Sequence, residues 1–209
     1  MSYDPLDAAW DEAYERMSQE LYPEHKEQAI AEFTRSRLKS YYVDHSDVLI
    51  PAIRMFKESK AMADAGHNGA ALIFAASATE LFLKAALLRP VVYGFVHSEG
   101  LADLIVNTTL SQTGFKRYKQ LLSELFLELI NVNLLSIKRP SSTLPLLEEA
   151  SEIQVQRNKI LHQGVEISAE EAQLGISVAT EVFNRILVEV LSALGFSLQK
   201  GGILLNIEK

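Results

Sequence analysis

Residues 68–88 read NGAALIFAASATELFLKAALL, and this stretch decides the fold class. Its small residues allow close helix packing and its large apolar residues supply bulk, so the stretch predicts a helix buried inside a bundle. The apolar run continues further but carries Glu80, Lys84 and Arg89, whereas a membrane helix needs about 20 mostly uncharged residues. We therefore expect a buried core helix, which Pro90 breaks or kinks.

The composition of the chain sets the first limits on its function. The 209 residues fit one domain with decorations, since a domain usually holds about 100–200 residues. The 48% of hydrophobic residues excludes a disordered chain, and the lack of cysteine excludes disulfides, thiolate zinc sites and cysteine nucleophiles. The N-terminus lacks a signal-peptide pattern, so we expect a cytoplasmic protein without membrane attachment. The net charge of −7 argues against a general nucleic-acid-binding surface but allows a local basic cleft.

Helical periodicity recurs on both sides of the core stretch, and it predicts an all-α fold. Ser168 and Glu171 have the spacing of a capping box, which marks the start of the last long helix. Besides the core helix, the predicted helices cover approximately residues 5–21, 23–41, 46–66, 115–135, 143–162 and 168–194.

The pattern changes after Gly195, where a short β-hairpin is predicted around Lys200-Gly201-Gly202. An isolated hairpin is only marginally stable, so we expect it to pack on the bundle or on a partner. We divide the chain into an N-terminal helical extension (1–44), a helical bundle (45–195) and a C-terminal tail with the hairpin (196–209).

Residues 156–164, QRNKILHQG, hold the combination of side chains that best indicates chemistry. Gly164 is expected to end a helix, which puts His162 in or just after the last turn. Asn158 and His162 share one helix face, whereas Arg157 and His162 lie about 140° apart around an ideal helix. Arg157 and His162 converge in one chain only if the helix frays or the arginine curls around it. Two apolar neighbours are expected to point into the core, namely Ile160 and Leu161.

Arginine, asparagine and histidine together suit a phosphodiester. Arg157 can bind two phosphate oxygens at once, and Asn158 can orient a neighbouring group. Histidine side chains titrate near neutral pH, so His162 can move a proton to or from a hydroxyl. A structural role is the competing interpretation, because a histidine at a helix C-terminus interacts well with the helix dipole. In that case Arg157 lies in a buried salt bridge and His162 caps its own helix, away from any cleft.

Two further residues are candidates for a supporting role. Glu80 either forms an exposed pair with Lys84 or orients Arg157 as a partly buried carboxylate, and both interpretations stay open. Lys159 could add positive charge to a local cleft. None of the remaining histidines has the spacing of a metal site, so we expect no metal and assign surface or capping roles to His25, His45, His67 and His97.

The motif resembles the Arg-X4–6-His motif of the HEPN superfamily, in which a polar residue, often asparagine, follows the arginine. Arg157-Asn158 and His162 occupy these positions here. Residues 78–84, ATELFLK, are similar to the glutamate-bearing helix of these proteins, and the order of the helices also agrees. The resemblance covers roughly residues 45–195.

The resemblance implies a HEPN-like helical bundle that forms a homodimer. In catalytic members two motifs meet across the dimer in a metal-independent ribonuclease site, so His162 would transfer protons, Arg157 would bind the scissile phosphate and Asn158 would support them. Such members are toxins, phage-defence effectors or RNA-processing enzymes. We therefore expect an RNA substrate and an antitoxin or regulatory protein as a further partner, without DNA or a cofactor. Other members are non-catalytic modules that bind a partner protein or a nucleotide, and this alternative stays open.

Overall fold

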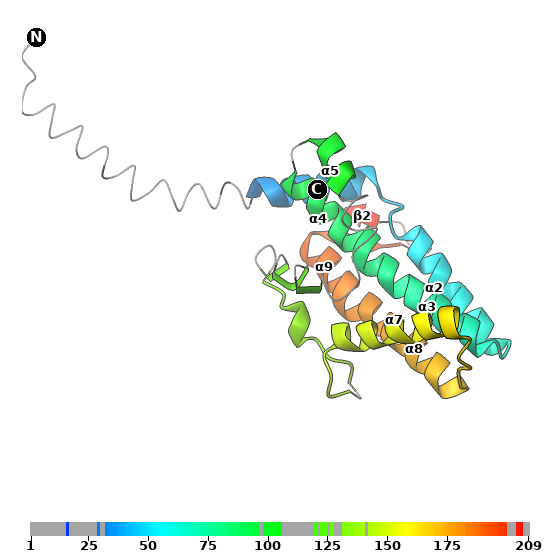
Figure 1. Cartoon of the computed structure of the whole chain (residues 1–209). Helices are drawn as coiled ribbons and strands as arrows, with labels where there is room; N and C mark the ends of the chain where they lie inside the picture. The colour runs from blue at the N-terminus through cyan, green and yellow to red at the C-terminus, as the bar shows by residue number, and fades with distance from the viewer. Residues whose placement is uncertain are drawn as a thin grey trace, which may run out of the picture.

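The computed structural model describes residues 16, 29, 32–96, 98–105, 119–120, 122–124, 126–127, 131–140, 142–199 and 204–206. These residues are mostly helical, with one small antiparallel sheet near the C-terminus (Figure 1). The predicted all-α class and the predicted hairpin are therefore confirmed. The predicted helix over residues 5–21 lies outside the described residues, apart from Arg16, which is helical.

The bundle is built from long helices that pack around α3 (Asn68–Leu83). α3 contacts α2 (Ile50–Asp64), α7 (Leu146–Gln163) and α8 (Ala169–Glu181). A helix over residues 32–44 adds Leu38 and Tyr42 to the same core. The shorter helical elements are the π-helical turn η1 (Lys84–Leu88), α4 (Arg89–Phe95), α5 (Glu99–Ile105), the 3₁₀ turn η3 (Leu134–Ser136), the π-helical turn η4 (Val182–Leu187) and α9 (Val188–Ala193).

α3 is buried because apolar side chains project from nearly every side of the helix. Ala71, Leu72, Ala75 and Phe82 are all fully buried. At Gly175 of α8 an added Cβ would lie 3.5 Å from the Leu72 side chain, so the glycine lets α8 approach α3 closely. Among the described residues, the helical stretch Asn68–Gly94 is the one long and apolar enough to cross a membrane, and 65% of its most apolar part is buried within the bundle. This degree of burial is typical of a helix in the core of a bundle.

Pro90 interrupts the α-helical pattern without ending the helix. The backbone passes from α3 through the π-helical turn η1 into α4, which contains the proline in its first turn. Proline has no N–H to donate to the carbonyl four residues earlier, which here is that of Ala86. The Tyr42 hydroxyl donates to Ala86 O at 2.6 Å instead. Burial raises the pKa of Tyr42, so this hydroxyl stays protonated and remains a donor.

The first half of α7 is anchored to the rest of the bundle. Arg139 Nη2 donates to Glu149 Oε1 at 2.8 Å, and this hydrogen bond raises the pKa of Arg139. One turn later Gln154 Nε2 donates to the carbonyl oxygen of Ala76 in α3 at 2.8 Å. α7 begins at Leu146, a few residues later than predicted. These contacts hold the N-terminal half of α7, which precedes the motif in the sequence, against the bundle.

Helix termini follow the predicted signals in most places. Ser168 and Glu171 form both hydrogen bonds of the capping box, as predicted. Gly66 and Gly164 follow α2 and α7 with φ of +78° and +65°. The predicted end of a helix at residue 135 is wrong, because Asn131 has a φ of +57° and residues 131–133 are not helical. The left-handed conformation at Asn131 stops the helix earlier.

The C-terminal hairpin packs on the bundle. β1 (Phe196–Leu198) pairs antiparallel with β2 (Leu204–Asn206), with Ser197 opposite Leu205. Phe196 and Leu204 are 3% and 4% exposed and belong to the main core. The Phe196 ring lies 5.4 Å from the ring of Tyr42, so the hairpin covers the helix over residues 32–44.

Candidate functional site

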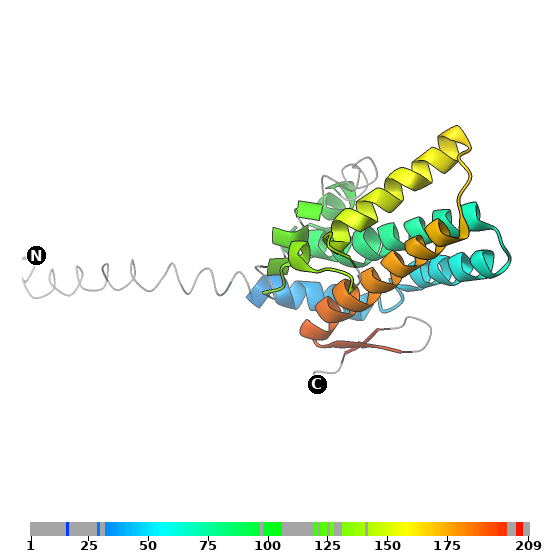
Figure 2. The ribbon, with the colours of Figure 1, turned by 90° about the horizontal axis from the view of Figure 1, so that it is seen from below.

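The motif lies at the end of α7, at the edge of the bundle. Figure 2 shows this end of α7 directed away from the other helices. The helix stays regular to Gln163, and Gly164 N donates to Ile160 O at 3.1 Å in the left-handed cap. The helix therefore does not fray near His162, and the about 140° that separates Arg157 from His162 on an ideal helix is kept.

Arg157 faces α3. Its Nη1 lies 4.0 Å from Glu80 Oε2, and both side chains are 30% exposed. Glu80 Oε1 accepts a hydrogen bond from Lys84 Nζ at 2.7 Å. The Glu80 carboxylate therefore pairs with Lys84 along α3 and also lies within ion-pair distance of Arg157 on α7. Lys84 and Arg157 thus both lie within ion-pair distance of one carboxylate.

The guanidinium of Arg157 retains hydrogen-bonding capacity. Its Nε atom is buried and has no hydrogen-bond partner among the described residues. The pairing with Glu80 at 4.0 Å is an ion pair rather than a short bidentate hydrogen bond. A buried donor without a partner is costly, so the contact with Glu80 leaves the guanidinium incompletely satisfied.

Asn158, Lys159 and His162 project from α7 at about 100°, 200° and 140° from Arg157 around an ideal helix. All three are exposed. Asn158 and His162 share one face, as the spacing predicts. The His162 side chain forms no hydrogen bond within the part of the chain that the structure describes, and its position in the last turn lets a protonated ring interact with the helix dipole. One chain therefore separates Arg157 from the pair formed by Asn158 and His162.

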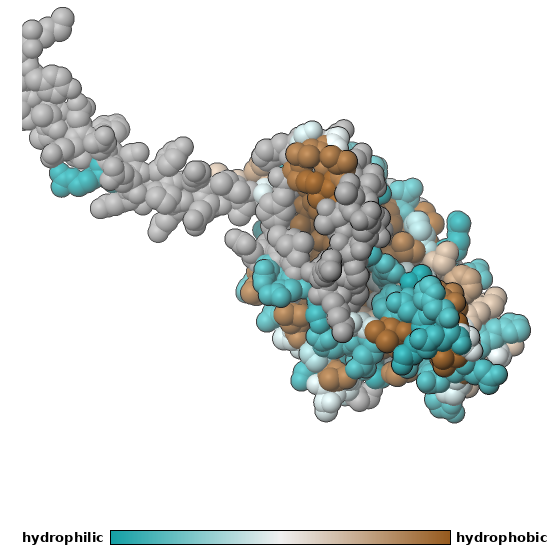
Figure 3. All heavy atoms as spheres, viewed as in Figure 1, coloured by the Kyte–Doolittle hydropathy of each residue, from teal (hydrophilic) through white to brown (hydrophobic). Residues whose placement is uncertain are grey.

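Exposed apolar side chains flank the motif. Leu161 was expected to point into the core, but it is 51% exposed, and the expectation is wrong because the end of α7 extends past the residues that would cover it. Ile160 does pack against the core, over Gly69. Val155 and Val165 are 46% and 42% exposed. Figure 3 shows hydrophobic side chains scattered among hydrophilic ones over this part of the bundle.

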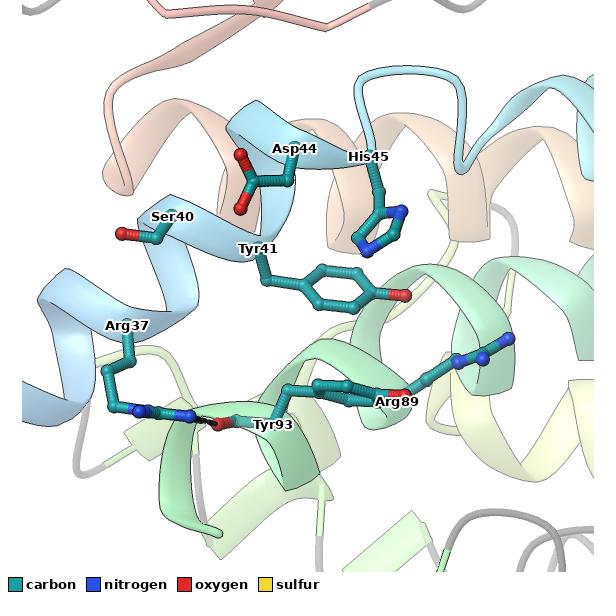
Figure 4. Close-up of a pocket in the computed structure, with 7 residues that line it drawn as sticks. All are labelled: Arg37, Ser40, Tyr41, Asp44, His45, Arg89 and Tyr93. Atoms are coloured by element: carbon teal, nitrogen blue, oxygen red, sulfur yellow. Dashed lines mark hydrogen bonds between the residues drawn. The ribbon is translucent and has the colours of Figure 1, made fainter. Parts of the chain in front are cut away.

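A second group of polar side chains lines a cavity of about 520 Å³ between the helix over residues 32–44 and α4 (Figure 4). The sequence patterns did not single out this group, although His45 is exposed, in agreement with its predicted surface or capping role. The only local signal is the spacing of four residues that places several members on one helix face. Among the described residues, the cavity is lined by Arg37, Ser40, Tyr41, Asp44, His45, Arg89 and Tyr93.

Within the described residues, no group of three or more histidine or acidic side chains has the geometry to hold a metal ion. Comparison with family models, with characterised proteins and with solved structures gives no match. Function is therefore inferred from the chemistry and placement of the side chains themselves.

Proposed function

We propose that this chain is a metal-independent endoribonuclease of the HEPN type that acts as a homodimer. The observation that carries the proposal is the placement of Arg157 and His162 on different faces of one exposed helix end, next to the exposed apolar residue Leu161. A second copy packed on this surface would bring the arginine of one chain toward the histidine of the other. The dimer is thus part of the proposed site.

The chemistry uses a nucleophile that RNA already contains. His162 accepts the proton of a 2′-hydroxyl, whose oxygen attacks the adjacent phosphorus. The partner's Arg157 binds the non-bridging phosphate oxygens and offsets the charge that develops on them. The bond to the 5′-oxygen breaks, the leaving oxygen takes a proton from the protonated His162 or from water, and a 2′,3′-cyclic phosphate remains. Asn158 orients His162 from the same helix face, and Lys159 adds positive charge nearby.

Alanine substitutions test the proposed site directly. Arg157→Ala and His162→Ala should each lower the cleavage of single-stranded RNA by about 10²–10⁴-fold, the range of general acid–base catalysis. His67→Ala is the matched control, because His67 is also exposed at a helix end but lies outside the motif. Circular dichroism should show unchanged helix content for all three variants. Cleavage that survives both motif substitutions would exclude the proposed site.

Mixing the two inactive variants tests whether the site is shared between chains. In a heterodimer of Arg157→Ala and His162→Ala chains, one composite site keeps a native arginine and a native histidine. Half of the dimers in an equal mixture are heterodimers with one of two sites intact, so about a quarter of the wild-type activity should return. No recovery in a mixture shown to contain heterodimers would contradict pairing of Arg157 with His162 across the dimer.

The second candidate is a non-catalytic HEPN-like module that binds a partner protein or a nucleotide. It is favoured by the pairing of Arg157 with Glu80 and by the net charge of −7. It predicts no cleavage of RNA by the purified protein and normal growth of cells that overproduce it. The ribonuclease proposal, with its toxin or phage-defence setting in the cytoplasm, predicts growth arrest that the His162→Ala variant does not cause. Recovery on co-production of an antitoxin or regulatory protein is expected in that setting.

A further inference from the structure

The cavity between the helix over residues 32–44 and α4 has the properties of a ligand site. Its volume of about 520 Å³ falls within the range of about 300–1,000 Å³ that small-molecule pockets occupy. A second cavity of about 340 Å³ shares three residues with the first, Tyr41, His45 and Arg89. In Figures 1 and 2 this region lies at the other end of the bundle from the end of α7. The cavities are therefore separate from the site proposed for RNA cleavage.

The walls of these cavities are held in place by hydrogen bonds between the helices that form them. Arg37 Nε and Nη2 donate to Tyr93 O, each at 3.3 Å, and Nη2 also donates to Val96 O at the end of α4. Arg37 thus links the two walls and satisfies carbonyl groups of a helix end. Behind the walls, the bond from the Tyr42 hydroxyl to Ala86 O fixes the helix over residues 32–44 to the π-helical turn η1. The spacing of the walls is therefore set before any ligand binds.

The π-helical turn gives Arg89 its position in the cleft. Each π-helical turn contains one more residue than an α-helical turn and rotates all later side chains around the helix axis. Arg89 follows directly after η1 and comes to line both cavities, and Tyr93 follows one turn later. Such turns occur frequently at functional sites, because they aim side chains that a regular helix would place elsewhere. The π-helical turn before Pro90 thus contributes to the placement of Arg89 in the cleft.

Three side chains shared by both cavities provide the chemistry. Arg89 offers a planar cation that matches a carboxylate or phosphate, and the His45 ring and the Tyr41 hydroxyl can both donate hydrogen bonds. The Tyr41 ring lies 4.4 Å from the His45 ring and 4.9 Å from the Tyr93 ring. Figure 4 shows the Tyr41 ring between His45 and Tyr93. This combination of a cation, donors and aromatic faces suits an anion that carries a planar ring.

The acidic and apolar residues of the lining narrow the class of ligand. Asp44 and Asp47 are exposed at the two cavities, and their carboxylates disfavour a doubly charged anion. The smaller cavity is lined by Val48, Ile50 and Pro51, which can cover an apolar ring. We propose that this cleft binds a small aromatic oxyanion of single negative charge, with the oxyanion at Arg89 and the ring against the aromatic and apolar residues.

Calorimetric titration of the full chain with simple probes tests the proposal. Benzoate carries one charge and a ring, phenyl phosphate carries a ring and more charge, acetate carries the charge alone, and benzamide carries the ring alone. Benzoate should bind most tightly, and acetate and benzamide should each bind at least about tenfold more weakly, since a charge-assisted hydrogen bond or a buried ring is worth that much. If phenyl phosphate binds more tightly than benzoate, the preference for a single charge is wrong and the cleft is a phosphate site. If acetate binds as tightly as benzoate, the proposed role of the ring is wrong.

Variants locate the binding in the cleft. Arg89→Gln should weaken benzoate binding by about tenfold or more, because the charged donor is lost. Arg54→Gln is the matched control, since Arg54 is exposed on α2 and lines neither cavity. His45→Ala changes an exposed residue that the core does not depend on, so it tests the site even if the Arg89 variant does not fold. The proposal is wrong if benzoate fails to bind at millimolar concentration or if binding survives both Arg89→Gln and His45→Ala.

Discussion

The end of α7 and the cleft between residues 32–45 and α4 contain similar side chains in different arrangements. Each has an arginine, a histidine and a further donor. In α7 these groups come from one helix, and its regular geometry holds Arg157 and His162 on different faces. In the cleft they come from two elements that pack against each other, and Tyr41, His45 and Arg89 line the same cavities.

This difference determines what each region needs in order to function. The cleft brings its groups together within one chain, so its ligand binding should not depend on protein concentration. The end of α7 needs a second chain to bring arginine and histidine together, so its activity should follow the monomer–dimer equilibrium. Substitutions at one region should therefore leave the function of the other unchanged.

Disrupting the proposed dimer should have the largest effect. Leu161→Asp places a charge on the exposed apolar surface at the end of α7, where desolvation of the carboxylate opposes association. RNA cleavage should fall by about 10²-fold or more at concentrations at which the wild-type protein is dimeric, because each site loses one of its catalytic groups. Analytical ultracentrifugation should show a monomer, and benzoate binding in the cleft should be unchanged.

The matched control changes an exposed leucine elsewhere. Leu104 of α5 is 61% exposed, so Leu104→Asp introduces the same charge without burial of the carboxylate. We expect its dimerisation and cleavage to match those of the wild-type protein. A Leu161→Asp variant that remains dimeric and active would show that the end of α7 is not the interface. A variant that becomes monomeric but stays active would show that one chain is sufficient.

Local sequence patterns were sufficient to predict much of the fold. The apolar residues 68–88 identified the central helix, and the capping box at Ser168 and the glycines Gly66 and Gly164 marked helix boundaries close to those in the structure. These features depend on neighbouring residues, so the sequence contains their causes. The placement of the motif in the last turns of α7 was predictable for the same reason.

Features that depend on distant contacts could not be predicted. The helix continues beyond Pro90 in part because a hydroxyl from Tyr42, far away in the sequence, supplies the donor that the proline lacks. Leu161 is exposed because α7 extends past its neighbours, which its own periodicity does not reveal. His45 is a cavity residue only because the helix before it packs against α4. No local sequence pattern specifies these contacts between distant parts of the chain.

The next largest effect is expected from Tyr42→Phe, which acts on the cleft. The variant leaves the Ala86 carbonyl without the hydroxyl donor, and Pro90 has no N–H that could take the place of this donor. The free energy of unfolding should therefore fall by about 1–3 kcal/mol. Because this bond fixes one wall of the cleft to the π-helical turn, benzoate binding should weaken severalfold. RNA cleavage, measured below the temperature at which the variant unfolds, should be retained.

Thr79→Val provides the control for the loss of a buried hydroxyl. Thr79 Oγ1 donates to Ala75 O at 2.9 Å within α3, but that carbonyl also accepts the α-helical N–H of Thr79 itself. Its substitution should therefore destabilise the protein less than Tyr42→Phe in chemical denaturation and should not change benzoate binding. Equal losses of stability would mean that the Tyr42 hydroxyl does not have the special role that we assign to it opposite Pro90.

The smallest effect is expected at two glycines that end helices. Gly164 and Gly66 have φ of +65° and +78°, and an added Cβ would meet no atom within 4 Å at either position. Alanine should therefore cost about 1–2 kcal/mol at each, since only the left-handed backbone opposes it. Thermal unfolding should show similar losses for the two variants. Cleavage should decrease severalfold only in Gly164→Ala, because that substitution changes the last turn of α7, which holds His162. An equal decrease in both variants would mean that cleavage follows overall stability, and the end of α7 would then have no privileged role in catalysis.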